Sequence, residues 1–230
     1  MVVLNCDELS VREVNSALRR LEAGDKATVL NPSGTHNLAV GIDNPIDITI
    51  VGNAGYYIGG LCGTKDGAGP TIEVEGFVGW SVGENLMGGT LRVRGSASQS
   101  AGSSARGGLI QIDGDASLRA GISLKGATVA VAGNVGAMSG FMAQAGTLLV
   151  GGDAGAGLGD SLYEAVIYVA GSIKSLGTDA VEEDMTDEDV LIVKRLVETT
   201  GFDHIDPVNV RRIASARTLY HFSSHNHGAY

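Results

Sequence analysis

Cysteine, proline and basic residues are scarce in this sequence, and each shortage excludes a class of protein. The two cysteines, Cys6 and Cys62, lie far apart and form no CxxC motif, so neither a disulfide framework nor a four-thiolate iron site is expected on the chain. The 4 prolines exclude a collagen triple helix as the reason for the 35 glycines. A net charge of -10 makes nucleic acid an unfavourable partner.

Long apolar runs are also missing. No segment approaches eighteen uninterrupted apolar residues, and residues 1–7 contain neither the basic nor the apolar region of a signal peptide. The sequence therefore predicts a cytoplasmic protein with no membrane partner.

Glycine is abundant, and it recurs at a fixed spacing. Short β-rich runs end in Gly52, Gly76, Gly95, Gly114, Gly133, Gly152 and Gly171. The first step is 24 residues and every later step is 19. A second column with the same steps comprises Gly59, Gly83, Gly102, Gly121, Gly140 and Gly159. Two columns in phase predict an all-β solenoid, a right-handed parallel β-helix with about seven 19-residue coils.

Other glycine motifs do not fit. The run 155–159 does not match the G-x-G-x-x-G dinucleotide fingerprint, and no phosphate-binding G-x-x-x-x-G-K-[ST] occurs. Acyltransferase β-helices would repeat every six residues.

Both ends of the predicted β-helix, residues 26–178, carry helical patterns. Within residues 1–25, Ser10 and Glu13 form a capping box, and apolar residues at helical spacing continue to Leu21 before Gly24. Residues 179–230 are predicted to be an acidic linker followed by C-terminal helices and a tail. One helix would run from a Thr186 cap to Gly201, and a last helix would begin at Asp206-Pro207 and carry Arg211, Arg212 and Arg217. These two helices would cover the far end of the rod.

The acidic stretch before the first of these helices has two interpretations, a solvated linker or a docking strip for a basic partner. Its members are Asp179, Glu182, Glu183, Asp184, Asp187, Glu188 and Asp189.

Candidate catalytic and metal-binding residues are few. Cys62 would act as a nucleophile only if His36 approached it, and it is interpreted as a small loop residue. His221, His225 and His227 cluster in a polar tail that is better suited to docking than to metal binding. The acid–base pairs of polysaccharide-cleaving β-helices could draw on Asp113, Asp115 and Asp153, but the latter two occupy a column with Asn53 and Asn134, where turn hydrogen bonding is the shared role. No catalytic, cofactor-binding or metal-binding residue is therefore predicted on this chain.

The glycine columns over residues 26–178 and the segment 29–41 resemble the GXGXG domain, the β-helical module of glutamate synthase large chains. Among short members of that family, the chain is most similar to the small β-helical subunit of N-methylglutamate synthase. The resemblance implies a non-catalytic subunit that braces a glutaminase-like amidotransferase subunit and a synthase subunit carrying FMN and an iron–sulfur cluster, and that lines a route for ammonia or an amine. The complex would join methylamine to glutamate with release of ammonia.

Two other functions stay open at this point. The same module occurs in a subunit of formylmethanofuran dehydrogenase. A stand-alone β-helical enzyme acting on a polysaccharide would need a groove lined by carboxylates and basic residues.

Overall fold

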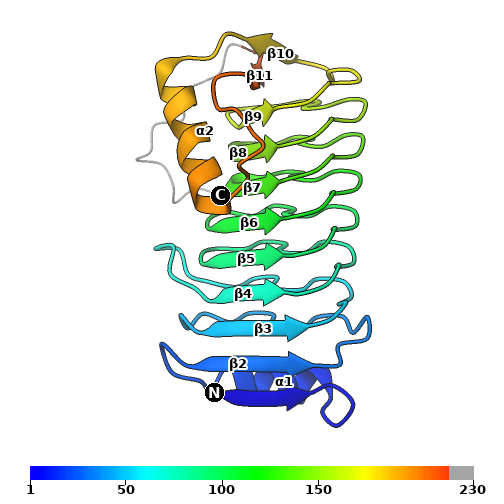
Figure 1. The fold of residues 1–230 in the computed structure, drawn as a ribbon, viewed down its shortest axis with the longest axis vertical. Helices are drawn as coiled ribbons and strands as arrows, with labels where there is room; N and C mark the ends of the chain where they lie inside the picture. The colour runs from blue at the N-terminus through cyan, green and yellow to red at the C-terminus, as the bar shows by residue number, and fades with distance from the viewer. Residues whose placement is uncertain (218–230) are drawn as a thin grey trace.

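The computed structural model describes residues 1–217, which form a β-solenoid (Figure 1). Eight strands stack in chain order with parallel pairing: β2 (Lys26–Leu30), β3 (Asp47–Val51), β4 (Thr71–Val74), β5 (Thr90–Val93), β6 (Leu109–Ile112), β7 (Lys125–Val131), β8 (Ala145–Val150) and β9 (Val166–Val169). The predicted parallel β-helix is confirmed. It has one coil more than the glycine repeat indicated, because β2 does not end in glycine.

Alternation along each strand builds the core. In β4, Ile72 and Val74 point inward and are fully buried, while Glu73 between them points outward. The register places Ile72 against Leu91 and Val74 against Val93 of the next coil, so equivalent positions of successive coils stack in columns. A one-residue slip would turn every aliphatic side chain to solvent, and the buried column therefore fixes the register.

A second wall closes each coil through single parallel bridges, Ala54 to Val78 to Ala97 and onward to Ile173. The second glycine column lies beside this wall in the left-handed region, with φ of +67° at Gly83 and +71° at Gly102. An added Cβ at Gly102 would come within 2.5 Å of Val129 Cγ2. Glycine is needed there both for its backbone angle and for space.

The N-terminal end is covered by β1 (Val2–Asn5), which pairs with β2, and by α1 (Val11–Leu18). The Ser10–Glu13 capping box is present, and Val14 and Leu18 are fully buried. The helix ends at Leu18, earlier than predicted, because the N–H groups of Arg20 and Leu21 bond to the carbonyls three residues back and continue the chain in tighter turns. The Arg19 side chain donates hydrogen bonds to the carbonyls of Val40 and Gly41.

The C-terminal end differs from prediction. The expected last helix from Asp206-Pro207 is wrong, because the chain turns there and forms β11 (Arg211–Ser215). Strand β11 pairs antiparallel with β9, and β10 (Ala180–Glu183) pairs antiparallel with β11. The free edge of β9 supplies backbone hydrogen bonds that outweigh any helical preference of this short segment.

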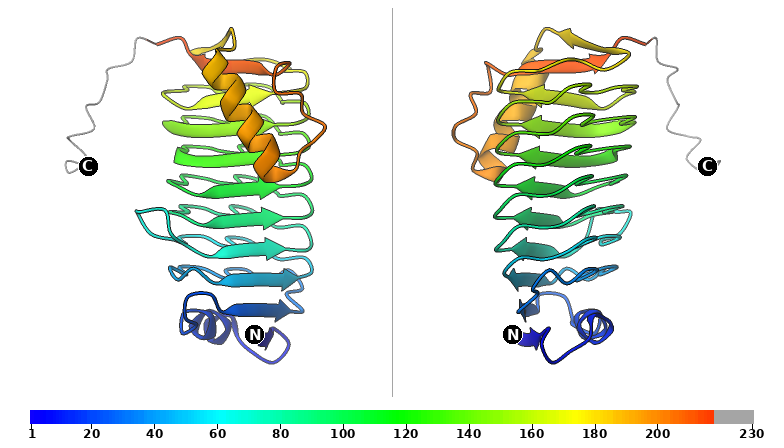
Figure 2. Two further views of the ribbon diagram at one scale, coloured as in Figure 1. Left: turned by 60° about the vertical axis from the view of Figure 1, so that its left-hand side comes forward. Right: turned by 90° about the vertical axis from the view of Figure 1, so that its right-hand side faces the viewer.

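The helix α2 (Asp187–Thr200) forms between Thr186 and Gly201 as predicted, and it crosses the outer face of the last coils (Figure 2). Its Val193 is buried against the outward-facing side chains of Ala130, Leu149 and Tyr168, on β7, β8 and β9. Neither α1 nor α2 is long and apolar enough to cross a membrane, and these are the helices found in residues 1–217.

The acidic stretch is not a solvated linker throughout, because part of it is strand β10. Four of its seven carboxylates pair with basic side chains of the same chain: Glu182 with Arg211, Glu183 and Asp189 with Arg212, and Asp179 with Arg217. The arginines expected on a last helix therefore bind β10, the residue before it and the start of α2.

Asp189 joins three elements. Its carboxylate accepts hydrogen bonds from Thr186 at the start of α2, from the Tyr168 hydroxyl on β9 (2.5 Å) and from Arg212 on β11 (3.1 Å). Burial raises the pKa of Asp189, but these hydrogen bonds outweigh burial and lower the pKa to about 2. The side chain is therefore ionised in the folded protein at neutral pH and holds α2 against the solenoid.

Candidate functional site

Cys62 and His36 do not form a nucleophile–base pair. Cys62 lies in the segment between β3 and β4, outside the strands, as the sequence indicated, but its side chain is fully buried in the core, where its Sγ donates to Ala39 O (2.9 Å). Burial raises the pKa of its thiol to about 11, which disfavours the reactive thiolate. His36 lies on the exterior, and its Nδ1 accepts from the backbone N–H of Tyr56 (2.9 Å).

The column after the strand-ending glycines has the role predicted for it. Asp115 accepts from Asn134 N (2.7 Å), Asn134 from Asp153 N (2.8 Å), and Asp153 from Ser172 N (2.7 Å). The hydrogen bond from Ser172 lowers the pKa of Asp153. Each side chain thus ties its coil to the next. The lowered pKa favours the ionised form of Asp153, which is unsuited to a general acid.

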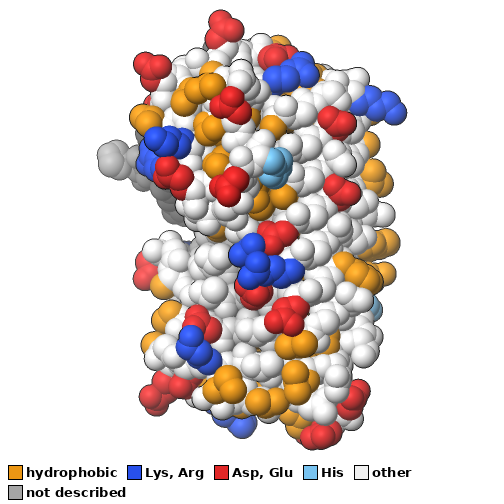
Figure 3. Space-filling view, in the orientation of Figure 1, with side chains coloured by type: hydrophobic (Ala, Val, Ile, Leu, Met, Phe, Trp, Pro, Cys, Tyr) orange, Lys and Arg blue, Asp and Glu red, His pale blue; other side chains and the backbone are white. Residues whose placement is uncertain are grey.

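Asp113 takes part in a polar junction that sequence reasoning missed. Its carboxylate binds Arg92 of β5 (2.8 Å), and Gln111 of β6 donates both to Asp113 and to the carbonyl of Thr200 at the end of α2. His204 contacts the carbonyl of Ala132 (3.0 Å), and both residues line an open pocket together with Arg92 and Asp113. Acidic and basic side chains gather over the middle strands in Figure 3. These contacts anchor the end of α2 to the sheet.

No group of three His, Cys, Asp or Glu side chains able to hold a metal occurs within residues 1–217. His221, His225 and His227 lie outside the described residues.

The most distinctive exposed feature is an aromatic strip formed by His36, Tyr56 and Trp80. These residues lie on three successive coils, and their rings stack with centroid separations of 4.3 Å and 5.2 Å and interplanar angles of 13° and 12°. Phe77 and Tyr57 belong to the same coils and are 55% and 44% exposed. The first coils therefore present several large rings to solvent, where isolated apolar residues would be ordinary but a group of them is informative.

Glycine holds the strip flat against the solenoid. A Cβ at Gly55 would lie 2.0 Å from His36 Nδ1, and a Cβ at Gly79 would lie 2.4 Å from Tyr56 Cδ1. The rings of His36 and Tyr56 thus each rest on the backbone of the following coil. Only a residue without a side chain leaves room for a ring there.

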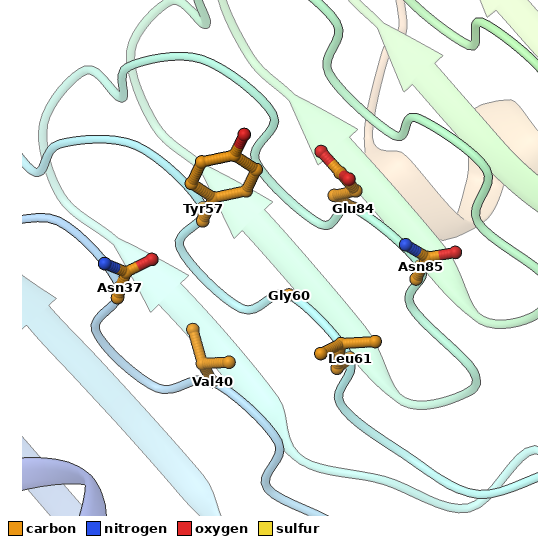
Figure 4. Close-up of a pocket in the computed structure, with 7 residues that line it drawn as sticks. All are labelled: Asn37, Val40, Tyr57, Gly60, Leu61, Glu84 and Asn85. Carbon is orange, nitrogen blue, oxygen red and sulfur yellow. The ribbon is translucent and has the colours of Figure 1, made fainter.

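An open pocket of about 300 Å³ lies beside Tyr57 (Figure 4). The side chains of Asn37, Val40, Tyr57, Leu61, Glu84 and Asn85 surround Gly60. We call it the Glu84 pocket. The side chain of Glu84 takes part in none of the ion pairs found in residues 1–217. An apolar wall beside an unpaired carboxylate suits an amphipathic cation.

The sequence contains a signal for this surface. The column of turn-bonding side chains is polar at Asn53, Ser96, Asp115, Asn134, Asp153 and Ser172. Phe77 is the aromatic exception in that column, and it is exposed. At this position an exposed ring replaces the polar side chain that elsewhere accepts a hydrogen bond from the next coil. This indicates that Phe77 has a role other than stabilising the turn.

The fold and this surface define a β-solenoid that displays a rigid, exposed aromatic face. No protein-family model matches the chain. It is 51% identical over 233 residues to Protein GlxC of Rhizobium meliloti (strain 1021), and the match covers 100% of both chains. The chain therefore belongs to the GlxC family. This membership fits the glutamate-synthase-like family that the glycine columns resemble.

Proposed function

We propose that this chain is a non-catalytic structural subunit of a glutamate-synthase-like complex, most specifically an N-methylglutamate synthase. In that complex it would brace a glutaminase-like amidotransferase subunit and a synthase subunit that carries FMN and an iron–sulfur cluster. The observation that supports this most is that each candidate catalytic side chain is engaged in a bond that stabilises the fold. Cys62 bonds to a carbonyl inside the core, Asp113 forms an ion pair, and Asp115 and Asp153 accept hydrogen bonds from the backbone of the next coil.

A route for ammonia or an amine, if the subunit lines one, would run along its surface. The interior is filled by stacked aliphatic side chains such as Ile72, Leu91 and Ile110, all fully buried. Packed interiors leave few voids larger than a water molecule. The route would therefore lie between this chain and a partner subunit.

A polysaccharide-acting enzyme is less well supported. Such an enzyme needs two carboxylates free to act as acid and base. Asp113, Asp115 and Asp153 are all engaged with Arg92 or with backbone N–H groups.

The test is purification of the tagged chain under native conditions from its source. Mass spectrometry of the bound proteins and an absorbance spectrum for flavin would follow. We expect a glutaminase-like subunit and a flavin-bearing synthase subunit, with methylamine-dependent turnover in the recovered complex and none in the chain alone. A chain that is recovered alone, or that turns over substrate by itself, would contradict the proposal.

A further inference from the structure

We infer that the aromatic strip and the Glu84 pocket together form the docking site for a protein subunit that inserts an arginine or lysine side chain beside Glu84. This inference rests on the proposed function, since it assumes that the chain works inside a complex. To the proposed function it adds which face of this chain binds the partner subunit and which type of partner side chain is bound there.

The first argument is a contrast within the molecule. Outward-facing Leu149 and Tyr168 on the last coils are covered by α2, so the chain buries exterior apolar side chains where its own residues reach them. Tyr56 and Trp80 on the first coils stay 37% and 48% exposed. Exposed aromatic residues grouped with a polar rim are typical of protein interfaces.

The second argument is rigidity. His36 and Tyr56 lie on Gly55 and Gly79, where any larger residue would displace the rings, and the stack fixes their orientation. Ordering flexible side chains is one of the costs of association. A strip that is already ordered loses little entropy on binding, as the aromatic anchors of interfaces do.

The third argument is the charge in the pocket. A neutral apolar side chain in this pocket would remove water from the Glu84 carboxylate without replacing its hydrogen bonds. An acidic side chain would be repelled. An arginine or lysine side chain would place its apolar stem against Leu61 and Val40 and its charge next to Glu84, with the Tyr57 ring available for a cation–π contact.

The decisive experiment compares recovery of the partner subunits by tagged wild type, Trp80→Ala and Glu84→Gln at equal chain concentration. Loss of a central aromatic anchor typically weakens binding by about tenfold or more, and we expect that for Trp80→Ala. For Glu84→Gln we expect a loss of about threefold to tenfold, together with a weaker dependence of binding on salt.

Matched controls come from the repeat itself. Leu118 occupies the position of Trp80 two coils further along and is 42% exposed, so Leu118→Ala removes an exposed apolar side chain outside the strip. Glu198→Gln removes an exposed carboxylate on α2. Both controls should recover partner subunits as the wild type does, and circular dichroism should show all four variants folded.

The outcomes separate the two proposals. Recovery of no other subunit by the wild type would refute the proposed function and this inference with it. Recovery that is equal for the wild type, Trp80→Ala and Glu84→Gln would overturn only the inference. A wild-type dimer that becomes a monomer in Trp80→Ala would also overturn it, because the occupant would then be a second copy of this chain.

Discussion

Two groups of apolar or aromatic side chains lie on the outside of the solenoid. The chain covers one group with its own helix and leaves the other exposed to solvent. On the last coils, Leu149 and Tyr168 are covered by α2, which is attached through Asp189 and Arg212. On the first coils, the stacked rings of His36 and Tyr56 lie on Gly55 and Gly79, and the strip that they form with Trp80 is exposed to solvent. We therefore expect the covered group to contribute to folding stability and the exposed group to contribute little to it. An exposed group that adds little to stability is expected to be kept for binding.

The largest expected difference between the two regions is in stability. Tyr168→Ala removes a buried ring and its hydrogen bond to Asp189, and should lower the free energy of unfolding by about 3–5 kcal/mol. Tyr57→Ala removes an exposed ring of the same type and should cost about 1 kcal/mol or less. Denaturant titration of both variants measures this, and equal losses would mean that the exposed Tyr57 ring is as important for stability as the buried Tyr168 ring.

The second prediction concerns the attachment of α2 and its dependence on pH. The folded pKa of Asp189 is about 2, below the ordinary value of about 3.9. Ionised Asp189 therefore stabilises the folded chain above about pH 4, and its contribution of about 2 kcal/mol is lost as the pH falls from about 4 towards about 2. The Asp189→Asn variant should lack this pH-dependent contribution to the free energy of unfolding.

The measurement is chemical unfolding at several pH values between about 3 and 6. The stability difference between wild type and Asp189→Asn should shrink towards acid pH. A difference that stays constant over this range would show that Asp189 does not carry the attachment.

The third prediction sharpens the role of glycine under the strip. Gly79→Ala would push Tyr56 off the backbone, and overpacking of this kind costs about 1.5 kcal/mol. Gly60→Ala is the control, since its Cβ would meet its nearest atom at 3.4 Å, an ordinary contact. Near-ultraviolet circular dichroism should show a changed aromatic signal only for Gly79→Ala, and an unchanged signal would mean that the stack tolerates a side chain there.

The smallest expected effect is that of Trp80 on the free chain. Trp80→Ala should change the free energy of unfolding by about 0.5 kcal/mol or less, as exposed substitutions do. Trp80 is the single tryptophan of the sequence, so its fluorescence reports on the strip alone. Acrylamide should quench this fluorescence efficiently in the free chain, and poor quenching there would contradict the exposure of the strip.

The coils could be predicted from the sequence because the information is periodic and local. Glycine at a fixed step and alternating aliphatic residues define both the strand and its neighbour, so the repeat alone is enough to match Ile72 with Leu91. The strand β11 could not be predicted in this way. Residues 211–215 form a strand because β9 offers a free edge, and that edge depends on contacts between segments far apart in the sequence.

The position of α2 and the aromatic strip could be predicted from the sequence only in part. The outward position of successive strands changes from Glu73 and Arg92 to Leu149 and Tyr168, and this change indicates that something covers the last coils. For the strip, His36, Tyr56 and Trp80 are spaced by 20 and 24 residues. The step of 24 is also the first step of the glycine columns, so the repeat matches Tyr56 with Trp80. His36 lies before the first glycine of either column, so the repeat gives no match for it.

The reversed direction of β11 has a consequence for polymerisation. A parallel solenoid whose last strand kept an open edge could accept the first strand of another rod and grow by simple end-to-end addition, as heterologous contacts that do not close generate filaments. Here the terminal edge belongs to β10, which runs antiparallel to its neighbour and carries Glu182 and Glu183 in ion pairs with arginines. An antiparallel edge strand with charged side chains does not continue the parallel ladder, so we expect it to disfavour end-to-end addition of another rod.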